Sequence, residues 1–209
     1  MSPADPRSSR RIRAVPAALL VTAVTLAGCG GSGGPSGGGE KPAPPAAVAR
    51  LATVDGKRAG SVSLSPAGDK VRVRVKATGL EPGLHGFHFH ERGLCEPNAQ
   101  MEGERMPFST AGGHVARAGS DHGEHAGDLP PLLVADDGTV TAIAVTGRFK
   151  VEELMAGDGS AAMVHADPDN AANVPDRYIG PGRKAGPDSE TLETGDSGDR
   201  VACGRVERP

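Results

Sequence analysis

The stretch Lys70–Lys76 (KVRVRVK) decides the fold class, because apolar and basic residues alternate along it without a break. Successive side chains of a β-strand point to opposite faces, so Val71, Val73 and Val75 would face a core while the basic residues face water. The segment is therefore predicted to be a half-buried strand.

Seven further segments are alternating or short apolar runs, and glycine-containing turns such as Asp55-Gly56 and Asp136–Gly138 separate them. Only Val151–Leu154 is predicted to form a helical turn. We therefore predict an all-β fold, an eight-stranded Greek-key β-barrel or sandwich. The other predicted strands are Val48–Val54, Gly60–Ser65, Gly86–His90, Leu132–Ala135, Val140–Val145, Ala161–His165 and Val201–Val206.

Two long segments, residues 91–131 and 166–199, interrupt the strand pattern. Loops of this length are uncommon in a compact domain unless they carry function or are disordered. Histidines and cysteines lie in or beside them. We therefore predict two long functional loops, with partial disorder across residues 180–198.

Residues 1–28 have the organisation of an export signal. Four arginines precede an apolar run, Ala14–Leu26, that is too short to span a bilayer comfortably. The run ends in residues 26–29 (LAGC), which resemble a bacterial lipobox, in which the cysteine is lipidated and becomes the new N-terminus. An ordinary secretory signal with a cysteine near its cut site is the alternative. The Arg10-Arg11 pair leaves general secretory and twin-arginine export both open.

We predict lipidation at Cys29, a Gly- and Pro-rich linker over residues 29–47, and one domain over residues 48–209. The protein would then be anchored to the cell membrane on its extracytoplasmic face. Removal of residues 1–28, which carry four arginines and one aspartate, takes the formal charge from −3 to −6. An acidic chain with no basic run or aromatic platform argues against nucleic-acid binding.

The cysteines are consistent with export. Once Cys29 is lipidated, Cys95 and Cys203 remain as a pair in an oxidising compartment. A disulfide between them would close a loop of more than a hundred residues, which stabilises a fold mainly by restricting the unfolded chain.

His88 and His90 are the first residues that point to a chemistry. Residues i and i+2 of a strand share a face, so this pair presents two imidazoles side by side. Imidazole suits copper and zinc. For the motif alone, a surface His-x-His without a metal is the alternative.

The surrounding sequence, Pro82–His90 (PGLHGFHFH) followed by Gly93 and Cys95, closely resembles the copper-site signature of copper/zinc superoxide dismutases. The resemblance extends from Val48 to Glu207, and with the lipobox it indicates a bacterial lipoprotein branch of the family. Four further segments are similar to family segments in the same order: Ala111–His114, Gly127–Pro130, Ala162–His165 and Gly198–Gly204.

The resemblance implies two metal sites that share one histidine. His114 would bridge copper to zinc through both ring nitrogens, as an imidazolate stabilised by the two metal charges. The implied copper ligands are His88, His90, His114 and His165. The implied zinc ligands are His114, His122, His125 and Asp128.

The zinc loop departs from the family pattern. The segment from His122 to Asp128 (HGEHAGD) is compressed, with two residues between its histidines where the family has a longer excursion. Some bacterial relatives similar to this chain after His165 lack the zinc site. A tetrahedral zinc site and a loop with a solvated histidine therefore both stay open, and the retained ligand types favour zinc.

Two further positions match family residues with supporting roles. Asp169 matches a carboxylate that accepts hydrogen bonds from one copper-side and one zinc-side histidine. Arg200, three residues before Cys203, matches the cation that guides superoxide to copper. His85 is predicted to bind nearby backbone rather than metal.

The resemblance implies dismutation of superoxide to dioxygen and hydrogen peroxide by a redox-cycling copper, with His114 carrying a proton. One alternative is a superoxide-dismutase-like copper-binding lipoprotein that stores or delivers metal without activity. Another is a structural envelope lipoprotein. Monomer and homodimer both stay open, since family members dimerise in different ways or stay monomeric.

Overall fold

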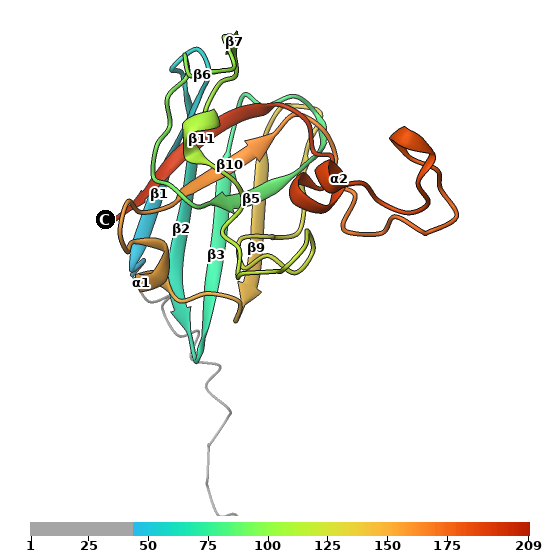
Figure 1. The fold of residues 1–209 in the computed structure, drawn as a ribbon. Helices are drawn as coiled ribbons and strands as arrows, with labels where there is room; N and C mark the ends of the chain where they lie inside the picture. The colour runs from blue at the N-terminus through green and yellow to red at the C-terminus, as the bar shows by residue number, and fades with distance from the viewer. Residues whose placement is uncertain (1–43) are drawn as a thin grey trace, which may run out of the picture. The chain divides into compact units, whose positions relative to one another are not determined.

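The computed structural model describes residues 44–209, and Figure 1 shows them as a curled antiparallel sheet with long connecting loops. Seven strands hydrogen-bond side by side in one sheet. Their order across the sheet is β5 (Phe87–His90), β10 (Ala161–His165), β11 (Arg200–Glu207), β1 (Ala47–Thr53), β2 (Arg58–Ala67), β3 (Lys70–Ala77) and β9 (Val140–Thr146).

A second sheet pairs β4 (Gly83–His85) with β8 (Leu132–Val134) and completes the fold. Only Gly86 separates β4 from β5, so the two form one interrupted strand that links the sheets. Between β8 and β9, the amide of Ala135 donates to the carbonyl of Thr139 at 2.9 Å and closes a hairpin. If β4 and β5 are counted as one strand, β8 is the eighth strand of the curled sheet. The all-β prediction is confirmed.

The predicted alternation separates core from solvent in β3. Val71, Val73 and Val75 are buried on one face, whereas Arg72 and Arg74 are only half-buried on the other. Each valine packs into the main apolar cluster, so the burial of aliphatic side chains supplies most of the driving force for this sheet.

Strand β5 differs because it is buried on both faces. Phe87 and Phe89 belong to the main apolar cluster, and the Phe89 ring meets Phe149 edge-on with centroids 5.3 Å apart. The alternate residues, His88 and His90, are buried on the opposite face of the strand. That face carries the cluster of polar residues described below.

The two long loops contain more regular structure than the sequence pattern predicted. The first contains the hairpin of β6 (Gln100–Met101) and β7 (Glu104–Arg105) and a 3-10 turn, η1 (Ser109–Ala111). The second contains η2 (Pro181–Arg183) and helix α2 (Ser189–Thr194). The expectation of partial disorder across residues 180–198 is therefore wrong where α2 forms.

Helix α2 forms because both of its ends are capped. Asp188 accepts a hydrogen bond from the amide of Thr191 at 2.9 Å, and Gly195 ends the helix in the left-handed conformation with φ 67°. These are the residue types that begin and end a helix. The predicted helical turn at Val151–Leu154 is present as α1.

The folded domain begins close to the predicted end of the linker. β1 begins at Ala47, one residue inside the predicted linker. The predicted export signal, Cys29 and the linker up to residue 43 lie outside the described residues. Among residues 44–209 there is no helix with the length and apolar character needed to cross a membrane.

Candidate metal centre

Two paired strands position three histidines of the centre. In β5, His88 lies opposite Met163 of β10, and β10 ends at His165. The amide of His165 donates to the carbonyl of Gly86 at 2.9 Å, which fixes the end of β10 against the break between β4 and β5. The strand register therefore brings His88, His90 and His165 to one place.

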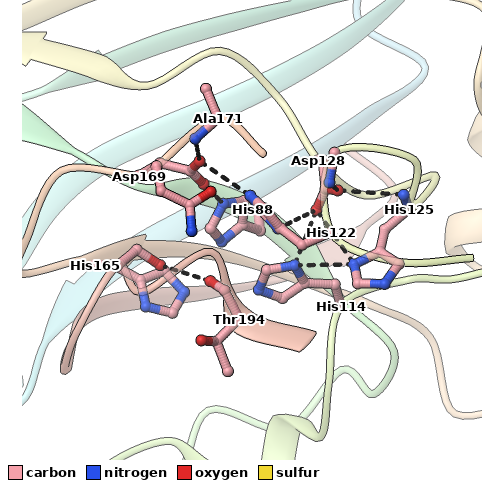
Figure 2. Close-up of polar contacts among 12 residues, drawn as sticks. His88, His114, His122, His125, Asp128, His165, Asp169, Ala171 and Thr194 are labelled. Atoms are coloured by element: carbon pink, nitrogen blue, oxygen red, sulfur yellow. Dashed lines mark hydrogen bonds and ion pairs between the residues drawn. The ribbon is translucent and has the colours of Figure 1, made fainter. Parts of the chain in front are cut away.

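The first long loop adds the remaining ligand types. Isolated bridges place His114 beside His90 and Asp128 beside His88. His122 and His125 lie between them in sequence, and the amide of His122 donates to the carbonyl of Leu192 in α2 at 2.6 Å. All these histidines are buried. Figure 2 shows His88, His114, His122 and His125 gathered near Asp128, with Asp169 next to His88.

The first group of donors comprises four histidines whose ligand atoms all lie within 4.8 Å of one another: His88, His90, His114 and His165. The Nδ1 of His90 lies 2.9 Å from the carbonyl of Gly112, and the Nδ1 of His165 lies 3.1 Å from the carbonyl of Gly198. A carbonyl only accepts, so both Nδ1 atoms donate. This leaves two Nε2 lone pairs facing each other at 3.2 Å, an arrangement that a shared cation satisfies.

The second group lies on the other side of His114. Its Nδ1 lies 2.9 Å from Asp128 Oδ1 and 3.4 Å from the Nδ1 of His125. Asp128 Oδ1 lies 3.5 Å from the Nδ1 of His122 and 3.6 Å from that of His125. Bonds of about 2.0–2.1 Å to a tetrahedral ion place neighbouring ligand atoms about 3.3 Å apart. The four separations, 2.9 to 3.6 Å, are therefore close to those of a zinc site.

His125 is the looser member of this set. The four ligand atoms within 4.8 Å of one another on this side belong to His88, His114, His122 and Asp128, so His88 takes the place of His125. The Nε2 of His125 donates to the carbonyl of Ser120 at 3.1 Å, which leaves its Nδ1 as the free atom toward His114. The compressed loop thus presents a complete His/His/Asp set in addition to His114.

Asp169 connects the two groups. The Nε2 of His88 donates to its Oδ2 at 2.6 Å, and the Nε2 of His122 donates to its Oδ1 at 3.0 Å. The Nδ1 atoms of both rings are buried and have no hydrogen-bond partner. Buried nitrogen acceptors without partners are costly, and metal ions on each side would satisfy them. The donor set therefore fits two metals.

Burial favours the neutral form of three ligand rings, those of His90, His114 and His165. Desolvation, aided by charge repulsion from neighbouring histidines, lowers the pKa of His114 to about 4 and that of His165 to about 3. Desolvation also lowers the pKa of His90 well below its usual value. Burial opposes charge on His122 too, but its hydrogen bond to Asp169 and the nearby carboxylates outweigh this and raise its pKa. Neutral imidazole is the form that binds metal.

Arg200 is fixed beside the four-histidine group. Its Nη1 donates to the carbonyl of Phe108 and its Nη2 to the carbonyl of Gly112, both at 2.7 Å. Gly112 also accepts from His90, so one carbonyl connects the arginine to the histidine group. Neutral acceptors do not cancel the charge of Arg200, which is only half-buried and can attract an anion.

Cys95 and Cys203 form a disulfide, with Cα atoms 5.6 Å apart. The bridge ties the loop after β5 to β11, and Arg200 is the first residue of that strand. His85 binds backbone as predicted, with Nδ1 2.7 Å from the carbonyl of His165 and Nε2 2.8 Å from that of Glu81. It belongs to neither histidine group.

The structure also brings in glycines that the sequence pattern did not single out. A Cβ on Gly112 would lie 2.3 Å from Glu91 Oε1, and one on Gly195 would lie 2.3 Å from His122 Nε2. Both positions have positive φ, so only glycine is unstrained there. The helix C-cap pattern predicts Gly195, but its contact with His122 depends on long-range packing.

Comparison with known proteins decides the family. Residues 58–206 match the family model for copper/zinc superoxide dismutase. The chain belongs to the copper/zinc superoxide dismutase family. It is 38% identical to the superoxide dismutase [Cu-Zn] of Mycobacterium tuberculosis over 173 residues, covering 80% of this chain and 72% of that protein. It is 32% identical to the enzyme of Deinococcus radiodurans, with coverage of 77% and 83%.

Solved structures agree with this assignment. The Cu/Zn superoxide dismutase from Brucella abortus is similar with a TM-score of 0.59 and 29% identity, covering 77% of this chain and 98% of that one. A SOD-like protein from Bacillus subtilis is similar with a TM-score of 0.55 and 28% identity, covering 76% and 96%. The chain is thus a superoxide dismutase of the copper/zinc type, with superoxide as substrate and copper and zinc as its metals.

Proposed function

We propose that the four-histidine group holds copper and that the group around Asp128 holds zinc, with His114 shared between them. The observation that carries this is which partner each ring nitrogen has. Backbone carbonyls accept from the Nδ1 atoms of His90 and His165, which leaves their Nε2 atoms facing each other at 3.2 Å. Asp169 accepts from the Nε2 atoms of His88 and His122, whose Nδ1 atoms have no partner. The proposed copper ligands are His88, His90, His114 and His165. The proposed zinc ligands are His114, His122, His125 and Asp128.

Copper bound by the four histidines would supply the one-electron couple that oxidises one superoxide to dioxygen and, with two protons, reduces a second to hydrogen peroxide; zinc would supply positive charge beyond His114. The chain supplies orientation, transfer of one of these protons and attraction of the anion. His114 belongs to both groups and its Nδ1 lies beside Asp128, so its Nε2 is the nitrogen left to hold a proton on the copper side. Delivery of that proton to the product is its proposed role.

Arg200 and Asp169 act on this centre in different ways. The fixed guanidinium of Arg200 attracts superoxide, and superoxide dismutase is a standard example of such electrostatic steering. Asp169 is a positioning residue, since it fixes the tautomers of His88 and His122 from opposite sides. The disulfide ties the loop after β5 to β11, the strand that begins with Arg200.

Metal stoichiometry with ligand variants tests the assignment. Metal-free protein titrated with Cu(II) and then Co(II), the latter as a coloured substitute for zinc, should take up one of each. His90→Ala should lose copper and keep cobalt, whereas His125→Ala should do the reverse. His85→Gln, at the histidine outside both groups, should keep both metals. Loss of neither metal in His90→Ala, or of both in His125→Ala, would contradict the two-site assignment.

We also propose that the enzyme works outside the cytoplasm as a lipoprotein anchored at Cys29. The export signal and lipobox support this, and the disulfide between Cys95 and Cys203 suits an oxidising compartment.

Cell fractionation tests the anchor. The full chain should sediment with membranes and incorporate labelled fatty acid, and Cys29→Ser should do neither. A full chain that fractionates as a soluble extracytoplasmic protein without label would leave an ordinary secretory signal as the explanation.

A further inference from the structure

A second arginine lies at the same site mouth as Arg200. Arg92 follows His90 by two residues, and its amide donates to the carbonyl of Ala111 at 3.0 Å. The neighbouring amide of Glu91 donates to the carbonyl of Gly113, also at 3.0 Å. The backbone that carries this arginine is therefore bound on both sides of Gly112.

The side chain of Arg92 also lies against Gly112. A Cβ built on Gly112 would lie 2.9 Å from Arg92 Nη2, so the guanidinium reaches the residue whose carbonyl binds both Arg200 and His90. The positive charge of Arg92 lowers the pKa of Arg200, although burial of Arg200 contributes more. Both guanidinium groups therefore lie beside Gly112, whose carbonyl also accepts from His90.

Each arginine lies at the same sequence distance from one cysteine of the disulfide. Arg92 precedes Cys95 by three residues, and Arg200 precedes Cys203 by three. The bridge joins these two segments at a Cα separation of 5.6 Å. Unlike Arg200, Arg92 has a side chain that is 47% exposed, which leaves it free to interact with solvent anions.

Glu91 opposes this charge. Its Oε1 lies 3.8 Å from Arg92 Nη2, and its side chain is 55% exposed. Such an exposed pair is weakly bound, so each group contributes its own charge to the field at the site mouth. Because the mature chain is acidic overall, the local sign at the mouth decides how superoxide approaches.

We propose that Arg92 is a second guiding cation for superoxide and that Glu91 limits its effect. The proposal rests on copper binding at the four-histidine group. Neither side chain needs to touch copper or its ligands, because the interaction acts on the approaching anion at a distance. A unit charge about 10 Å from an anion in water changes the encounter rate about twofold, and salt screens the effect.

Removal of the charge of Arg92 and removal of the charge of Glu91 should change the rate in opposite directions. Arg92→Gln should lower kcat/KM for superoxide about twofold at low ionic strength and flatten its decline with added salt, and Arg92→Lys should restore both. Glu91→Gln should raise kcat/KM about twofold and steepen the decline. Pulse radiolysis at matched copper content measures these rates. Azide binding to Cu(II), followed by absorption, should weaken in Arg92→Gln and strengthen in Glu91→Gln.

Arg208→Gln is the matched control. Arg208 lies beyond the far end of β11, about 26 Å along the strand from Arg200 at about 3.3 Å per residue. This variant should match the wild type in rate and salt dependence. A fall in kcat/KM for both Arg92→Gln and Glu91→Gln would indicate a merely structural role and would overturn the proposal. A salt dependence of kcat/KM that is unchanged in both variants would also overturn it. Failure of the proposed copper site is a separate result: the wild type would then bind no copper and would accelerate superoxide decay no more than metal-free protein does.

Discussion

Replacement of Asp169 by asparagine removes one of two acceptor oxygens at the point where both metal sites meet. Three donors use this carboxylate: the Nε2 of His88 on Oδ2, and the Nε2 of His122 and the amide of Ala171 on Oδ1. An asparagine offers one oxygen and a donating NH₂ group, so one histidine ring must face another donor. That ring then loses the tautomer that leaves its Nδ1 free.

We expect zinc to be lost more readily than copper in Asp169→Asn. His88 is held by the hydrogen bonds of β5 to β10 and is fully buried, so its ring has little freedom. His122 lies in a loop and is held by Asp169 and the carbonyl of Leu192. Loss of such a supporting carboxylate costs about 10–100-fold in metal affinity. This corresponds to about 1.4–2.8 kcal/mol on the zinc side.

Chelator competition measures this directly. Wild-type, Asp169→Asn and Asp167→Asn proteins are loaded with copper and cobalt, and the cobalt spectrum is followed against a graded chelator. Asp167 is an exposed carboxylate two residues away that contacts neither His88 nor His122, so its variant should match the wild type. Equal cobalt affinity in Asp169→Asn and wild type would refute the reasoning, because the tautomers would then be fixed by something else.

Three further predictions concern stability and rate. Replacement of Cys95 and Cys203 by alanine removes a bridge across 108 residues. In guanidinium denaturation it should lower the free energy of unfolding by about 4.7 kcal/mol, and a loss below about 1 kcal/mol would contradict the loop-entropy argument. Metal-free protein should lose stability as the pH falls from 6.5 toward 4, because burial lowers the pKa of His114 to about 4 and the unfolded chain therefore takes up its proton first. A urea midpoint that stays constant over this range would contradict that. Arg200→Gln should lower kcat/KM by about tenfold at low ionic strength, with Arg200→Lys in between, and an unchanged rate at equal copper content would remove its guiding role.

The strands could be predicted because their pattern is local. The alternation in Lys70–Lys76 describes β3 almost to the residue, and the hairpin signal at Asp136–Gly138 lies between β8 and β9. Pairing order could not be derived from this pattern. The sheet places β5 beside β10, which lies far along the chain, and their register depends on packing of the whole core.

The site residues that lie in family motifs could be predicted from the sequence. The residues assigned to copper and zinc do come together, and the compressed segment His122–Asp128 places His122, His125 and Asp128 close to His114. The contribution of α2 was missed, although Asp188 and Gly195 are typical cap residues. No local pattern predicts that the carbonyl of Leu192 binds the amide of His122, since this contact spans two loops.

The central claim is that this chain dismutates superoxide at copper held by the four-histidine group. Pulse radiolysis of superoxide with the purified protein tests it most directly, using metal-free protein, protein with copper alone and protein with copper plus zinc. We predict that superoxide decay accelerates in proportion to bound copper, that metal-free protein is inert, and that His165→Ala is inactive under the same loading. No acceleration in either copper-containing sample would contradict the account and leave a copper-binding protein without dismutase activity.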